Sequence, residues 1–220
     1  NLAETVGINK DKLHIIFPGI YAAKQLNSKY LSEADKIFSD SFPRIITVAR
    51  MDKRKGHDKI LMLIKNLKVK YPNIKYISVG FGDEEKNLIN LSQELELEKN
   101  VIFLKDINEN LKFSLLNKSN LFLMPSRIEK NSVEGFGISF IEAASYGVGS
   151  IGGKDGGASD AIKHNETGLL CDGSDLNSIS ESVAEFFEDK KYIQYGANAK
   201  IFSDKFVWKK IVKNYLNLIN

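Results

Sequence analysis

The fold of this chain is indicated by the stretch RIITVARMDKRKGHDKILMLIKNLKVKYPNIKYISV, residues 44–79. The stretch begins and ends with short apolar runs rich in β-branched residues, 44–49 and 74–79, which are typical of buried strands. Between them, residues 56–71 carry apolar side chains at helical spacing until Pro72 stops the helix. Two strands joined through a helix cannot form a tight hairpin, so the stretch predicts a crossover between parallel strands.

The same alternation continues along the chain. Further strands are predicted at 100–104, 120–124, 148–151 and 168–171, and further helices at 83–97, 108–118 and 137–146. This pattern predicts an α/β fold, a Rossmann-like parallel sheet with helices on both faces. In such sheets ligands bind at the carboxyl ends of the strands, so functional residues are expected there.

The two ends of the chain differ from this central part. We expect a short helix at 2–6, a strand-like run at 13–17 and a polar helix at 32–37, followed by nearly continuous helix from 175 to 219. We therefore divide the chain into an N-terminal and hinge segment (1–40), a ligand-binding domain (41–190) and C-terminal helices (191–220). Because the chain starts at Asn1 rather than Met, we expect it to be part of a longer protein.

Composition excludes several classes of function. A hydrophobic content of 43% with 27% charged residues is typical of a folded domain, and no apolar run approaches the ~20 residues that span a bilayer. The net charge of +3, with acidic and basic residues interspersed, does not indicate a nucleic-acid partner. Cys171 is the only cysteine in the sequence, which excludes an internal disulfide and a cysteine zinc cluster and fits a reducing compartment.

A basic loop, RMDKRKGH, follows the first predicted strand and leads into a helix. Arg50 and Lys55 at the carboxyl edge, with a helix N-terminus behind them, form a candidate site for a diphosphate. A solvated basic turn is the alternative.

Two glycines follow the second predicted strand, in Gly80-Phe81-Gly82. Glycine lets the backbone pass close to a ligand. A dinucleotide fingerprint, with Asp106 holding a ribose, is the competing interpretation and would make the protein an NAD-dependent oxidoreductase. It fails at Glu85, where a third glycine should stand, and because another strand and helix precede this strand.

The loop and helix after the fourth strand, residues 125–147, are the most informative segment. Gly135 and Gly137 leave the first amides of the helix open to an anion. Glu134 precedes the helix, and Glu142 follows about two turns later, where its carboxylate faces either solvent or the hydroxyls of a sugar. A second glycine-rich segment, 152–160, follows the fifth strand; we expect a loop that contacts phosphate or sugar, or else a flexible surface loop.

Together these segments resemble the C-terminal, donor-binding domain of GT-B-fold retaining glycosyltransferases, the large group 1 or family 4. The matching motifs occur in family order over about residues 40–190: VAR…KG at 48–56, VGFG at 79–82, PS at 125–126, EGFG…EA at 134–143, GG at 156–157 and TGLL at 167–170. Three places depart from the family pattern, namely Gly149, Asp160 and the pair Lys105-Asp106.

The resemblance implies a role for each matching residue. Arg50 and Lys55 would neutralise the donor diphosphate, Glu134 would position the donor sugar, and Glu142 would hold the nucleotide ribose. We count Glu134, Arg50 and Lys55 as catalytic, and assign donor binding to Gly82, Ser126, Arg127, Phe136, Gly137, Ile138 and Glu142. No metal and no cofactor is expected, because Arg and Lys take the place of a cation and the nucleoside-diphosphate sugar is a substrate.

The resemblance also implies the reaction and the partners. A hexose would pass from a nucleotide sugar, GDP-mannose or a UDP-sugar, to a glycan or lipid-linked acceptor with retention of configuration, as in polysaccharide biosynthesis. The family's N-terminal domain binds the acceptor, so this chain alone is expected to bind donor weakly and transfer poorly. We expect a cytoplasmic location, at the inner membrane face for a lipid acceptor. A non-catalytic nucleotide-binding module is a further alternative, and would depend on Arg50 and Lys55 but not on Glu134.

Overall fold

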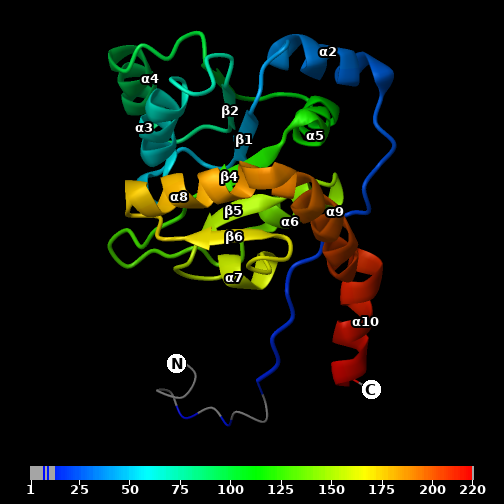
Figure 1. Ribbon diagram of the computed structural model, residues 1–220. Helices are drawn as coiled ribbons and strands as arrows, with labels where there is room; N and C mark the ends of the chain where they lie inside the picture. The colour runs from blue at the N-terminus through cyan, green and yellow to red at the C-terminus, as the bar shows by residue number, and fades with distance from the viewer. Residues whose placement is uncertain (1–6, 8, 10–12, 220) are drawn as a thin grey trace.

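The centre of the computed structural model, which describes residues 7, 9 and 13–219, is a six-stranded sheet (Figure 1). All its strand pairs are parallel, and the strand order is β3-β2-β1-β4-β5-β6. The strands are β1 (Arg44–Val48), β2 (Lys75–Val79), β3 (Val101–Leu104), β4 (Leu121–Met124), β5 (Ser150–Gly153) and β6 (Gly168–Cys171). The predicted parallel sheet is confirmed, and the order reverses between β1 and β4, which is where such sheets bind ligands.

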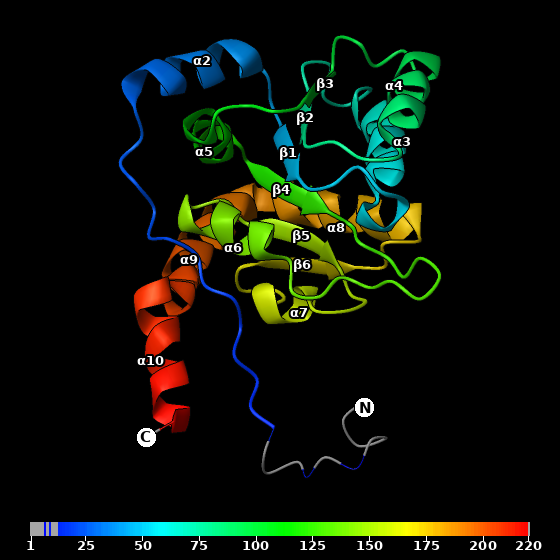
Figure 2. The ribbon, with the colours of Figure 1, turned by 180° about the vertical axis from the view of Figure 1, so that it is seen from behind.

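Helices cover both faces of the sheet, as Figures 1 and 2 show from opposite sides. One face carries α3 (His57–Leu67), α4 (Glu85–Glu94) and α8 (Leu176–Phe187). The other carries α2 (Ser28–Phe38), α5 (Glu109–Lys118), α6 (Ile138–Ser145) and the short α7 (Ala158–Ala161).

Successive side chains of the central strands enter different cores. Ile45 belongs to the cluster under α3 and α8, and Ile46 belongs to the cluster under α5 and α6. Leu123 and Met124 of β4 alternate in the same way. Because both faces are buried, these strands are mostly apolar rather than alternating with exposed polar residues.

The fifth strand differs from its predicted position. We predicted 148–151, whereas β5 covers Ser150–Gly153. A Cβ at Gly149 would lie 2.8 Å from Cβ of Tyr195 and 3.0 Å from Cζ of Phe186, so the helices pack too closely there for a side chain. Gly152 and Gly153 therefore lie inside the strand, paired with Met124 and Cys171, and not in the glycine-rich loop that we predicted.

The N-terminal segment is only partly as predicted. The polar helix is present as α2, the predicted helix at 2–6 lies outside the described residues, and the predicted strand at 13–17 is wrong. Within the described residues 13–17 form no strand pairing, and Phe17 instead stacks on Phe136, with 4.9 Å between ring centroids. The segment then bridges to the C-terminal part, where Ile20 pairs with Val207.

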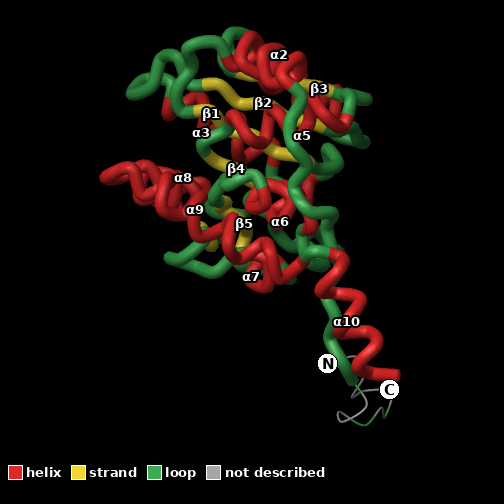
Figure 3. The backbone as a smooth tube through the Cα atoms, turned by 90° about the vertical axis from the view of Figure 1, so that its right-hand side faces the viewer, coloured by secondary structure: helices red, strands yellow, loops and turns green. Residues whose placement is uncertain are grey.

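The C-terminal part is helical, as predicted, with α9 (Lys191–Ser203) and α10 (Trp208–Ile219) after α8. Three short 3₁₀ turns occur in the described chain, η2 (Lys53–Lys55), η3 (Glu188–Lys190) and η4 (Asp204–Phe206). Figure 3 shows α10 leaving the body of the domain beside the N-terminal segment. The division at residues 40 and 190 stays a prediction, and Ala34 and Phe38 of α2 are buried in the core beneath the sheet.

Candidate functional site

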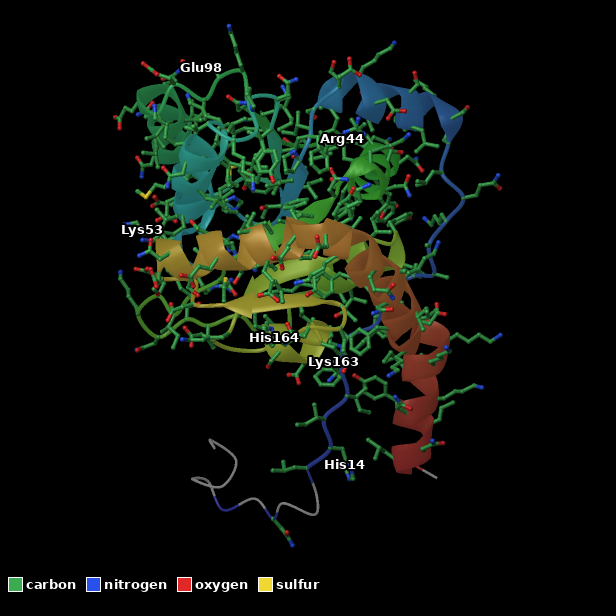
Figure 4. The ribbon with its side chains drawn as sticks, viewed as in Figure 1. His14, Arg44, Lys53, Glu98, Lys163 and His164 are labelled. Atoms are coloured by element: carbon green, nitrogen blue, oxygen red, sulfur yellow. The ribbon has the colours of Figure 1, made fainter. Side chains whose placement is uncertain are left out.

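The loops that follow β1, β2 and β4 meet at the carboxyl edge of the sheet. In Figure 1 the arrowhead of β6 points to this side, and Figure 4 labels Lys53 of the β1 loop there. The loops and α6 line a cavity of about 400 Å³ that is open to solvent. Its lining includes six of the predicted residues, Arg50, Lys55, Glu134, Gly137, Ile138 and Glu142, together with Val48, Ala49, Val79, Gly80, Phe81 and Ser139.

The basic loop is held in a defined shape. The side chain of Asp52 accepts a hydrogen bond from the Lys55 amide, 3.1 Å away, and so caps the turn η2. Gly56 then adopts a positive φ of 78°, and a Cβ there would lie 2.4 Å from the Pro125 carbonyl oxygen. Only glycine lets this loop lie so close to the segment after β4. The result is that Lys55 reaches Glu134.

Glu134 is buried, and its carboxylate is hydrogen-bonded to two cationic side chains. Its Oε2 accepts hydrogen bonds from Lys55 Nζ and from Arg54 Nη1, the latter at 2.8 Å. Burial alone raises the pKa of the Glu134 carboxyl, but the bonds and charges of Lys55 and Arg54 outweigh burial and lower it. Glu134 is therefore a carboxylate at neutral pH, hydrogen-bonded to two cationic side chains.

The loop that carries Glu134 is supported from behind by the glycine segment after β5. The Gly157 amide donates to the Glu134 carbonyl, 2.8 Å away. A Cβ at Gly157 would lie 1.9 Å from the Gly135 carbonyl oxygen, so the two loops are in backbone contact. The glycine segment after β5 thus fixes the position of the loop that carries Glu134.

The N-terminus of α6 opens onto the cavity. Gly137, in the left-handed region at φ 78°, receives no side-chain capping bond from the described residues. Gly137, Ile138 and Ser139 all line the cavity. Uncapped amides at a helix N-terminus, with the positive end of the helix dipole, favour an anion.

Glu142 lies on the same helix, and its carboxylate is also paired. Lys112 Nζ of α5 donates to Glu142 Oε1 at 3.0 Å, and both side chains are partly exposed. Glu142 also lines an adjoining cavity of about 250 Å³, whose walls come from α5, α6, Tyr146, the segment 19–24 and Trp208.

A buried histidine fixes the start of the basic loop. His57 donates through Nε2 to the Arg50 carbonyl, 3.1 Å away, and its Nδ1 lies 3.2 Å from the Ser78 hydroxyl, while the nearby Tyr76 hydroxyl donates to Thr47. Burial lowers the pKa of His57 to about 4, so the ring is neutral at pH 7. A neutral imidazole that faces a carbonyl with Nε2 must carry its proton there, which leaves Nδ1 as an acceptor.

Four other predicted residues do not line the cavity. Arg127 makes two hydrogen bonds to Asp58, at 2.9 and 3.0 Å, on the far side of the basic loop. Ser126 is buried, and its hydroxyl has no partner among the described residues. Phe136 packs on Phe17 and Phe206, and Gly82 lies against the Met51 backbone. Their assigned roles in donor binding stay predictions.

Sequence reasoning missed Arg54, Lys112, Ser139 and His57. Arg54 and His57 stand inside the basic loop already singled out, so their neighbourhood was a usable signal. Ser139 follows the glycines of α6. Lys112 carries no such signal, because its contact with Glu142 depends on how α5 packs beside α6.

The structure gives no support to the dinucleotide alternative. That fingerprint belongs in the first strand–helix turn, which here is the basic loop after β1, whereas Gly80-Phe81-Gly82 follows β2. Asp106 is exposed.

The sheet and its edge define a class: a Rossmann-like domain whose site combines cations, open helix amides and carboxylates, suited to an anionic ligand rich in hydroxyls. The chain belongs to the family described as glycosyl transferases group 1, whose model matches residues 32–202. Within the described residues no helix is long and apolar enough to cross a membrane.

Two curated relatives use GDP-mannose according to their names. The chain is 29% identical over 150 residues to the GDP-mannose-dependent alpha-(1-6)-phosphatidylinositol monomannoside mannosyltransferase of Mycobacterium tuberculosis, covering 67% of this chain and 39% of the relative. It is 32% identical over 154 residues to the corresponding monoacylated-substrate enzyme of Corynebacterium glutamicum, covering 69% and 40%. The chain thus spans about two fifths of the length of these relatives.

Solved structures share the fold. The Anabaena protein HepE, in complex with UDP and glucose, matches with a TM-score of 0.82 at 19% identity, over 98% of this chain and 59% of that one. A glycosyltransferase from Rickettsia africae matches with a TM-score of 0.83 at 19% identity, over 99% and 59%. The neighbours are GT-B glycosyltransferases, so the predicted Rossmann-like unit of a GT-B fold is confirmed.

Proposed function

We propose that this chain is the donor-binding half of a retaining glycosyltransferase that moves a hexose from a nucleoside-diphosphate sugar to a glycan or lipid-linked acceptor. One observation carries the proposal: a single cavity brings together Arg50, Lys55, Glu134, the N-terminus of α6 and Glu142. Cations and carboxylates at separate places along one wall match the diphosphate and the hydroxyls of such a donor.

The cationic part of the wall suits the diphosphate. Transfer of the sugar leaves negative charge on the departing phosphate, and positive groups placed beforehand stabilise that charge more in the transition state than in the ground state. Arg50 and Lys55, with the α6 amides, would supply this charge. We propose that they replace a metal ion.

The carboxylates suit the sugars of the donor. A carboxylate accepts two hydroxyl hydrogen bonds and so orients a ring. Glu134 lies next to Lys55, so it would contact the transferred sugar beside the phosphate. Glu142 lies about two helical turns further along and would hold the ribose.

The names of the relatives favour GDP-mannose as the donor and a phosphatidylinositol-linked mannoside as the type of acceptor. The HepE complex with UDP keeps UDP-sugars as the second candidate. We place the acceptor site in a partner domain outside this chain, at the inner face of the membrane.

The test is calorimetric titration of the chain with GDP, UDP, ADP and NADH, repeated with the best ligand on Arg50→Ala and Glu142→Ala. One nucleoside diphosphate should bind, and each substitution should weaken it by more than about 1 kcal/mol, the size of a lost charged hydrogen bond.

Binding of NADH alone would overturn the proposal, and equal affinity without Glu142 would refute the ribose assignment. Lys53→Ala is the matched control, since it removes a charge from the same loop but does not line the cavity.

A further inference from the structure

Two contacts compete for the ammonium group of Lys55. The proposed function needs Lys55 to bind the donor diphosphate, yet in this structure its ammonium is hydrogen-bonded to the Glu134 carboxylate. The side chain of Glu134 is only 8% exposed and that of Lys55 only 12%. A carboxylate this buried that loses its cation is strongly disfavoured, so it resists the departure of Lys55.

Arg54 removes this difficulty because it holds the same oxygen. Its Nη1 lies 2.8 Å from Glu134 Oε2, and its side chain is 18% exposed. A guanidinium forms strong charge-assisted hydrogen bonds to carboxylates and keeps its charge at all working pH values. With Arg54 in place, Glu134 keeps one cation when the other leaves.

The two cations approach from different sides. Lys55 lines the cavity, whereas Arg54 reaches Glu134 without bordering it. Arg54 is also tied down elsewhere: its carbonyl accepts from the Arg127 amide at 2.9 Å, and its guanidinium lies 3.8 Å from Asp52. Arg54 is therefore the cation that remains bonded to Glu134, and Lys55 is the cation that can turn toward a ligand in the cavity.

We infer that Arg54 is a positioning residue: it holds Glu134 in place so that Lys55 can exchange this carboxylate for the donor diphosphate. The inference rests on the proposed function and adds to it a residue that acts through Glu134. It also explains the geometry of this loop, in which two consecutive residues of one 3₁₀ turn, Arg54 and Lys55, hydrogen-bond to a single oxygen of Glu134.

The first test measures affinity for the nucleoside diphosphate that the unmodified chain binds best. Arg54→Gln should weaken binding roughly tenfold, the effect of about one charge-assisted hydrogen bond, because Lys55 then stays with Glu134. Arg54→Lys should recover part of the loss. In the Glu134→Gln background there is no charge to balance, so adding Arg54→Gln should change affinity by less than about twofold.

Equal losses in both backgrounds would overturn the inference, since Arg54 would then act on the phosphate directly, and so would unchanged affinity in Arg54→Gln. Lys53→Gln is the control for general loss of charge from this turn.

The second test needs no nucleotide and so separates this inference from the proposed function. Carbon-13 NMR of labelled glutamate carboxyls follows the titration of Glu134. In Lys55→Met the pKa of Glu134 should stay below its usual range, because Arg54 remains; in Arg54→Gln combined with Lys55→Met, burial should raise it above that range. If Lys55→Met alone raises the pKa of Glu134 above its usual range, Arg54 does not hold Glu134 and the inference fails, whatever nucleotide binds.

Discussion

Lys112 on α5 donates a hydrogen bond to Glu142 on α6, with 3.0 Å between Nζ and Oε1. The pair joins two helices on the same face of the sheet, and its carboxylate residue, Glu142, lines both the cavity of the site and the adjoining one. Both ends of the Glu134…Glu142 motif therefore carry a lysine from another element in this structure, Lys55 and Lys112.

If Lys112 orients Glu142 for a ribose, Lys112→Met should weaken binding of the nucleoside diphosphate several-fold while changing the free energy of unfolding by less than about 1 kcal/mol, as for partly exposed pairs. Calorimetry and urea denaturation measure the two effects. Lys118→Met is the matched control, because it removes a lysine pair to Asp35 from the same helix, away from the cavity. Equal effects of the two substitutions on affinity would contradict the prediction.

The buried His57 makes stability depend on pH. Its folded pKa of about 4 lies below the unfolded value of 6.5, so the unfolded chain binds the extra proton first. The free energy of unfolding is therefore highest above pH 6.5. It falls by about 3 kcal/mol in all as the pH is lowered toward 4. Denaturant unfolding at several pH values should show this slope for the chain and a shallower one for His57→Gln. The same slope in both would show that other groups cause it.

The backbone contact between Gly157 and Gly135 predicts an asymmetric response to added methyl groups. Gly157→Ala forces a Cβ against the Gly135 carbonyl and should cost about 1–3 kcal/mol of unfolding free energy, with loss of nucleotide binding as the Glu134 loop shifts. Gly135→Ala is the matched control, since its Cβ would meet no atom within 4 Å. Thermal unfolding measures both. If Gly135→Ala proved as damaging as Gly157→Ala, crowding would not be the cause.

The thiol of Cys171 should be unreactive in the folded chain. The residue is buried in β6, and burial raises the pKa of its thiol to about 12, so little thiolate forms at pH 8. A colorimetric aromatic disulfide reagent should label it only after denaturant is added. Rapid labelling without denaturant would show that β6 opens readily in the native state.

Much of the fold could be predicted from local patterns. Five of the six strands start within one residue of their predicted positions, because each is a short apolar run bounded by polar or turn residues. The exception, β5, contains two glycines that local propensity assigns to a loop, and only its neighbours β4 and β6 make it a strand. The predicted strand at 13–17 failed for the opposite reason: an apolar run without a strand partner stays unpaired.

The sequence by itself determined the parallel sheet, the edge where the candidate site lies, and the presence there of Arg50, Lys55, Glu134 and Glu142. It could do so because strand–helix alternation brings all loops after strands to one edge. Only the tertiary structure decided which charges meet: Arg54 and Lys55 at Glu134, Lys112 at Glu142, and Arg127 at Asp58 instead of the cavity. Such pairs join residues 30 to 80 positions apart. Their partners depend on how helices and loops pack within a few ångströms, which no local pattern encodes.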